Sequence, residues 1–138
     1  MTRRDVARST AVAGLPRSLT DVITAAEDRK AQDIVVLDLR SAHSFTDFFV
    51  ICSGKGPRQL HAIADAIEEA LRRSGARPNH VEGYERAGWI LIDCFDFIVH
   101  IFDPETRAFY ALERLWGNAE QIDVPPPGPA GAFRRQAP

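Results

Sequence analysis

The run of residues from Trp89 to Phe102 is the most apolar stretch of the chain, and it restricts the fold more than any other segment. It is too short to cross a bilayer, which takes about 20 apolar residues. It predicts two adjacent strands, Trp89–Asp93 and Asp96–Phe102, joined by a two-residue turn at Cys94-Phe95. In the second strand both alternating sets of side chains are largely apolar, which favours a sheet covered on both faces and an α/β fold.

Length and composition are those of one globular domain. The chain has 138 residues, of which 45% are hydrophobic and 26% charged. Cys52 and Cys94 lie far apart, without a CxxC motif or metal-ligand spacing. They predict buried, reduced thiols in a cytoplasmic protein. The N-terminal arginines are followed by no apolar segment, so no signal peptide is predicted.

Charge is distributed unevenly along the chain. From Glu82 to Asp123 there are nine acidic residues and three arginines, a net charge of −6, which leaves +4 for the rest. An acidic half repels phosphate and therefore argues against a nucleic-acid surface in this region. Two interpretations remain, a surface that steers a basic partner or simply a solvated acidic face.

Hydrophobic periodicity divides the chain into helices and strands between two irregular ends. Residues 1–17 are predicted to be a flexible arm, residues 18–122 a single domain, and residues 123–138 a disordered proline-rich tail. The elements predicted within the domain, besides the two central strands, are a helix from its N-cap Ser18 to about Lys30, strands at Ile34–Leu39, Asp47–Cys52 and Asn79–Glu82, a long helix from about Pro57 to Ser74, and a last short helix marked by Phe109, Leu112, Leu115 and Trp116.

Two segments raise the question of an enzyme. The loop Ser53–Pro57 contains glycines and a lysine but lacks the spacing of a phosphate-binding loop, so a plain strand-to-helix turn is the simpler interpretation. Asp93 and Asp96 flank the predicted turn, and with His100 they could serve a metal-dependent nucleotidyltransferase-type enzyme. In the competing interpretation, Asp93 and Asp96 are solvent-exposed acids and His100 is a hydrogen-bonded residue on a covered face of the sheet.

The large aromatic residues also allow two interpretations. Trp89, Tyr110 and Trp116 could all be core residues. Tryptophan and tyrosine are equally the residues that dominate protein interfaces, because they bury a large area at a small entropic cost. Placed beside acids, they would suit a basic protein partner.

Several separate motifs, in the right order, resemble the ribosomal silencing factor RsfS (Iojap) family over about residues 19 to 119. The motifs that carry the resemblance are Ser44–Gly54, Arg58-Gln59, Glu82-Gly83, Trp89–Asp93, Val99–Phe102 and Tyr110–Trp116. The resemblance implies a mixed sheet flanked by helices, related to the nucleotidyltransferase fold but lacking its catalytic acids. It implies no enzyme activity, no cofactor and no metal.

The same resemblance implies a function and a set of contact residues. The family binds the large ribosomal subunit through the ribosomal protein numbered fourteen, blocks joining of the small subunit and represses translation when nutrients are short. A homodimer away from the ribosome is also consistent with the resemblance. The partner-binding residues expected on this basis are Glu82, Trp89, Asp93, His100, Tyr110 and Glu113.

One position departs from the family pattern. The family usually has glycine between the two aspartates, in a tyrosine-glycine turn, whereas this chain has Cys94-Phe95. A positive φ is costly for phenylalanine. Either the turn is reshaped here, or Phe95 projects outward and enlarges the partner surface.

Overall fold

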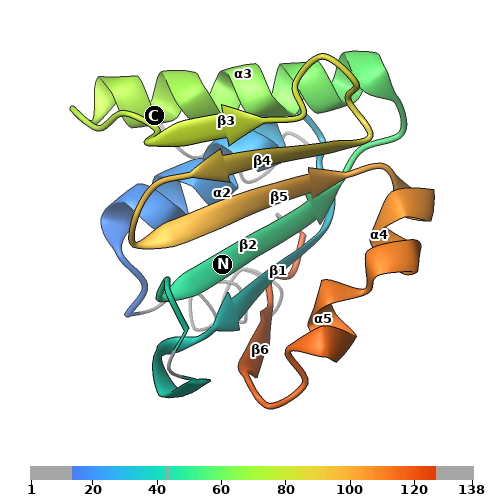
Figure 1. Ribbon diagram of the computed structural model, residues 1–138. Coiled ribbons are helices and arrows are strands. Elements are labelled where there is room, and N and C mark those ends of the chain that lie inside the picture. The colour runs from blue at the N-terminus through green and yellow to red at the C-terminus, as the bar shows by residue number, and fades with distance from the viewer. Residues whose placement is uncertain (1–13, 43, 127–138) are drawn as a thin grey trace.

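A computed structural model describes residues 14–42 and 44–126. Its centre is one six-stranded sheet, with helices on both sides (Figure 1). The predicted α/β class, with a mixed sheet flanked by helices, is confirmed. The elements in chain order are α2 (Arg17–Asp28), β1 (Gln32–Asp38), η1 (Arg40–Ala42), β2 (Phe48–Ser53), α3 (Pro57–Arg73), β3 (His80–Glu82), β4 (Trp89–Asp93), β5 (Phe97–Phe102), α4 (Pro104–Tyr110), α5 (Leu112–Leu115) and β6 (Glu120–Asp123).

The strands lie in the order β3-β4-β5-β2-β1-β6. The central pair, β2 and β5, is parallel, and every other pair is antiparallel. Each residue of β2 and β5 is buried, as expected for apolar strands at the middle of a sheet covered on both faces. The predicted pairing of the two central apolar strands is confirmed as the β4–β5 hairpin, in which Leu91 lies opposite His100.

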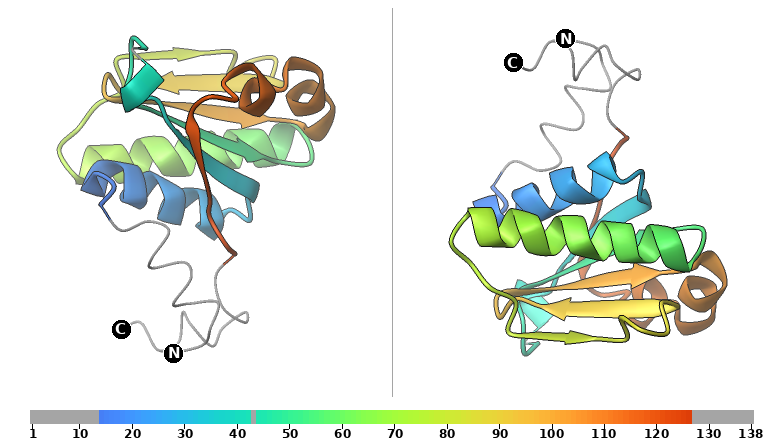
Figure 2. Two further views of the ribbon diagram at one scale, coloured as in Figure 1. Left: turned by 90° about the horizontal axis from the view of Figure 1, so that it is seen from below. Right: turned by 90° about the horizontal axis from the view of Figure 1, so that it is seen from above.

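The two faces of the sheet are covered to different extents. Figure 2 shows α2 and α3 together on one side and the short helices α4 and α5 on the other. The apolar stripe of α3, including Leu60, Ile63 and Ile67, is fully buried against the sheet. On the second side the core is smaller, and Trp89 and Leu91 are only partly buried beside it. This side of the sheet is therefore left partly open over β3 and β4.

Three local predictions were wrong at the ends of elements. Ser18 does not cap the first helix, because Pro16 occupies the N-cap position and no side chain caps the helix there. The last helix is two helices, since Ala111 has a left-handed conformation (φ 45°) that ends α4 and precedes α5. The start of α4 was also missed, although Asp103 accepts a hydrogen bond from the Thr106 N–H and Pro104 opens the first turn.

The strand β6 had no counterpart in the sequence prediction. It pairs antiparallel with β1 and ends at Asp123, one residue past the predicted domain boundary at 122. Val124 is also buried, and its N–H donates to the Ile34 carbonyl. The predicted arm at residues 1–17 lies outside the described residues up to residue 13, and the predicted tail lies outside them from residue 127.

Two further expectations concern the cysteines and the loop after β2. Cys52 and Cys94 are both free thiols, and burial raises the pKa of each to about 12, so both are protonated at neutral pH. The loop after β2 forms a strand-to-helix turn in which the Lys55 N–H donates to the side chain of Gln59.

Among the residues that the structure describes, no helix is long and apolar enough to span a membrane.

Candidate protein-docking face

Four of the six predicted partner-binding residues lie on the partly open side of the sheet. In β4 the side chains of Ile90 and Ile92 enter the helix-covered core, so Trp89, Leu91 and Asp93 point to the opposite side. Leu91 pairs with Glu82 in β3 and with His100 in β5, and paired residues share a face. We call the five residues Glu82, Trp89, Leu91, Asp93 and His100 the open sheet face.

Trp89 and His100 form a polar contact within this face. The Trp89 indole Nε1–H donates to His100 Nδ1 at 3.1 Å, which places the proton of the neutral imidazole on Nε2. His100 is only 4% exposed, and burial lowers its pKa to about 4. The imidazole ring therefore stays neutral at physiological pH, and its hydrogen bond orients the Trp89 side chain. His100 itself is buried and is not exposed to a partner.

Aromatic residues continue from this contact to α4. The Tyr110 ring lies 4.6 Å from the Trp89 ring and is 47% exposed. Phe109, beside it, is more exposed still. Phe109 was predicted to belong to the apolar stripe of a helix, but α4 buries none of its residues. Tyr110 therefore lies beside the open sheet face, next to Trp89, and Phe109 lies next to Tyr110.

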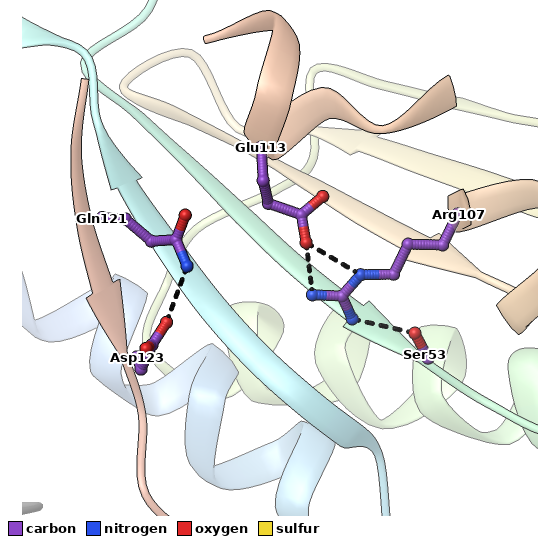
Figure 3. A network of polar contacts seen from close by, with 5 residues as sticks. All are labelled: Ser53, Arg107, Glu113, Gln121 and Asp123. Atoms are coloured by element: carbon purple, nitrogen blue, oxygen red, sulfur yellow. Dashed lines mark hydrogen bonds and ion pairs between the residues drawn. The ribbon is translucent and has the colours of Figure 1, made fainter. Parts of the chain in front are cut away.

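Glu113 serves a different contact. Its Oε2 accepts from Arg107 Nη2 at 2.8 Å and from Arg107 Nε at 3.1 Å. The remaining guanidinium nitrogen donates to Ser53 Oγ at 2.8 Å (Figure 3). This half-buried ion pair joins α4, α5 and the end of β2. Glu113 therefore has a structural partner within the fold, and its carboxylate is bonded to Arg107.

The turn between β4 and β5 differs by one position from the prediction. β4 ends at Asp93 and β5 begins at Phe97, so the connection has three residues, Cys94, Phe95 and Asp96, and not two. The Cys94 N–H donates to the Phe97 carbonyl at 2.9 Å, and Phe95 has a φ of 69°. Asp93 Oδ1 accepts from the Phe95 N–H at 2.9 Å, which fixes this carboxylate against the turn. The turn is therefore longer than predicted, and Phe95 also projects outward, with 67% of it exposed.

The enzyme alternative required Asp93, Asp96 and His100 to converge. Asp93 faces its own turn and His100 is buried under Trp89. Across residues 14–42 and 44–126, no three histidine, cysteine, aspartate or glutamate side chains come close enough together to hold a metal ion. The arrangement offers an aromatic and acidic surface in place of a ligand set.

Residues 13–137 match the family model described as "Ribosomal silencing factor during starvation". The chain belongs to the RsfS family. It is 38% identical over 102 residues to the "Ribosomal silencing factor RsfS" of Halalkalibacterium halodurans, an alignment that covers 74% of this chain and 87% of that one.

Other RsfS-family relatives give the fold and a link to the ribosome. A crystal structure of a protein from Chromobacterium violaceum superposes with a TM-score of 0.70 at 33% identity, covering 72% of this chain and 83% of that one. The mouse "Mitochondrial assembly of ribosomal large subunit protein 1" is 31% identical over 98 residues, which cover 69% of this chain and 43% of the mouse protein.

Within this RsfS-family chain, sequence reasoning missed the exposed phenylalanines Phe45 and Phe109, whereas an outward-projecting Phe95 was one of its two alternatives. Only Phe95 carried a usable signal, because it stands at a turn position that favours glycine. For Phe45 and Phe109, exposure depends on where the neighbouring strand and helix begin and end, which is the least predictable aspect of an element.

Proposed function

We propose that this chain is a cytoplasmic ribosomal silencing factor that docks its open sheet face on the ribosomal protein numbered fourteen of the large subunit. Bound there, it would sterically block joining of the small subunit and so repress translation when nutrients are short. The observation that carries the proposal is the partly exposed Trp89–Tyr110 pair on the partly open side of the sheet. The names of its relatives support a ribosomal partner.

The chemistry of the face suits a basic protein. Between Glu82 and Asp123 the net charge is −6, and one of the three arginines in that segment, Arg107, is committed to Glu113. Opposite charges would steer the encounter, and the rigid aromatic rings would supply most of the buried area. Trp89 is held in place by His100, so little side-chain entropy is lost on docking.

A binding assay with separated ribosomal subunits tests the proposal. The purified protein should co-sediment with the large subunit and not with the small one, and it should inhibit subunit joining. The most informative variants are Glu82→Lys and Tyr110→Ala, because both side chains are exposed, and the 2.8 Å contact between Glu82 and His80 lies at the surface and not in the core. Each should weaken binding to the large subunit by about tenfold or more.

The structure also determines which variants are poor tests. Charge reversal at Glu113 would break its ion pair with Arg107, and reversal at Asp93 would remove the acceptor for the Phe95 N–H. Weaker binding by either variant could then result from a less stable fold and not from a lost contact with the partner. Asp93→Asn keeps an acceptor oxygen while it removes the charge, so it is the better substitution at that position.

A matched control comes from the opposite side of the sheet. Glu69 is half-exposed on α3, and Glu69→Lys makes the same charge change as Glu82→Lys. It should leave binding within about twofold of the original chain. Equal loss of affinity from Glu69→Lys and Glu82→Lys would show that net charge, and not the open sheet face, determines binding. Co-sedimentation with neither subunit would refute the proposed function.

A further inference from the structure

Two exposed phenylalanines lie at one corner of the sheet, where β2 begins and the β4–β5 turn protrudes. Phe45 is 77% exposed and Phe95 is 67% exposed. Their chain segments are joined, since the Thr46 hydroxyl donates to the Phe95 carbonyl at 2.9 Å and the Asp47 N–H donates to the Asp96 carbonyl at 3.0 Å. We call Phe45 and Phe95 the phenylalanine corner. Large apolar side chains exposed close together, within segments that are bonded to each other, can mark an interaction site.

The backbone at Phe95 is held in an unfavourable conformation. Its φ of 69° is one that L-residues with a bulky side chain rarely adopt. The Asp96 N–H donates to the Cys94 carbonyl at 2.9 Å, closing a tight three-residue turn around Phe95. The side chains of Asp93 and Thr46 hold the N–H and the carbonyl of Phe95 from either side. The fold therefore tolerates strain at the position that displays the ring.

The charges around the corner are acidic. Asp47 and Asp96 are exposed, and Asp93 lies at the base of the turn. Arg40 is near enough to Asp47 for their charges to interact, but its guanidinium is bonded to Asp38 at 2.7 Å. A partner for this corner would therefore carry an apolar pocket with lysine or arginine at its rim.

The corner is continuous with the open sheet face. The Phe45 ring lies 6.4 Å from the ring of the buried Phe49, which in turn lies 4.6 Å from the buried His100 ring, so packing below the surface links the corner to the floor of the face. Asp93 belongs to both, as a member of the face and as the acceptor for the turn. A partner seated on the open sheet face would thus have its own surface directly beside the exposed rings.

We propose that Phe95, with Phe45 beside it, anchors the docked complex by inserting into an apolar pocket with a basic rim on the ribosomal partner protein. This inference rests on the proposed function and adds a residue that determines its specificity. It explains why an exposed aromatic ring occupies a turn position where glycine would fit without strain.

The test separates stability from binding by one substitution. Phe95→Gly removes both the ring and the strain, so the melting temperature should rise by about 3 °C while affinity for the large subunit falls at least tenfold. Phe95→Tyr keeps an aromatic ring and the strain, and it should leave both quantities near those of the original chain. Leu115→Ala, which trims an equally exposed apolar side chain on α5, should leave affinity within twofold.

The outcomes distinguish this inference from the proposed function. Failure of the original chain to bind the large subunit would refute the proposed function and the inference with it. Binding by the original chain with equal affinity for Phe95→Gly would refute the anchor alone. An equal loss from Leu115→Ala would show that the effect is not specific to the corner. Reduced self-association of Phe95→Gly, with unchanged subunit binding, would assign the corner to contacts between copies of the chain.

Discussion

The buried histidine beneath Trp89 makes the stability of the domain depend on pH. Burial lowers the pKa of His100 to about 4 in the folded protein, from 6.5 for the exposed side chain. Between these two values the unfolded chain binds a proton that the folded chain does not. Folding stability is therefore fully present above pH 6.5, falls as the pH drops toward 4, and loses nothing further from this group below that.

The two pKa values give the size of the effect. Integrated over the whole interval, the difference corresponds to a loss of about 3 kcal/mol in the free energy of unfolding. Between pH 7 and pH 5, where measurement is easiest, the loss from His100 is about 2 kcal/mol. That is a large fraction of the stability of a typical small domain.

Urea denaturation of the original chain and of His100→Gln at both pH values measures this loss. Glutamine keeps an acceptor oxygen for the Trp89 indole but does not titrate. All other titratable groups are common to the two proteins, so they cancel in the difference between the two pH dependences. The variant should be less stable than the original chain at pH 7. Between pH 7 and pH 5, the decrease in its free energy of unfolding should be smaller than that of the original chain by about 2 kcal/mol. Equal losses would refute the assignment of a buried, neutral His100.

Two further substitutions test how the site is supported, with stability again measured by urea denaturation. Gly83 has a φ of 79°, and an added Cβ would collide with the Trp89 carbonyl, so Gly83→Ala should cost about 1–3 kcal/mol. Gly56→Ala is the control, because its Cβ would meet nothing, and an equal cost there would contradict the steric argument. Arg107→Met should cost about 1–3 kcal/mol because it leaves Glu113 half-buried without its partner, and no measurable change would show that the ion pair does not support the fold.

Regular hydrophobic patterns were sufficient to predict most of the fold. The apolar run from Trp89 to Phe102 predicted the central hairpin, and the stripe that includes Leu60 and Ile67 predicted the long helix α3. Both signals are strong because burial of apolar area is the dominant favourable term in folding. The edge strand β6 escaped prediction because three of its four residues are polar, and its pairing with β1 is set by the sheet.

The candidate site was predictable only where strand alternation places residues. Glu82, Trp89 and Asp93 share a face because β3 and β4 pair in register. The contact between Glu113 and Arg107 depends on the left-handed conformation of Ala111, which ends α4. Alanine at this position does not indicate a helix end in the sequence. The conformation at Phe95 likewise depends on a hydrogen bond from Thr46, which is distant in sequence.

The pairing of β6 with β1 has a consequence for synthesis of the chain. β1 lies near the beginning of the described residues and β6 near their end, so a nascent chain that has reached residue 119 holds all but one strand of the sheet. Until residues 120–123 emerge, the outer edge of β1 has unpaired N–H and C=O groups. Such an edge is a template for pairing with another chain. Translation arrested just before β6 would therefore leave an aggregation-prone intermediate, and four more residues would cover the apolar edge of β1 with the short, mostly polar strand β6.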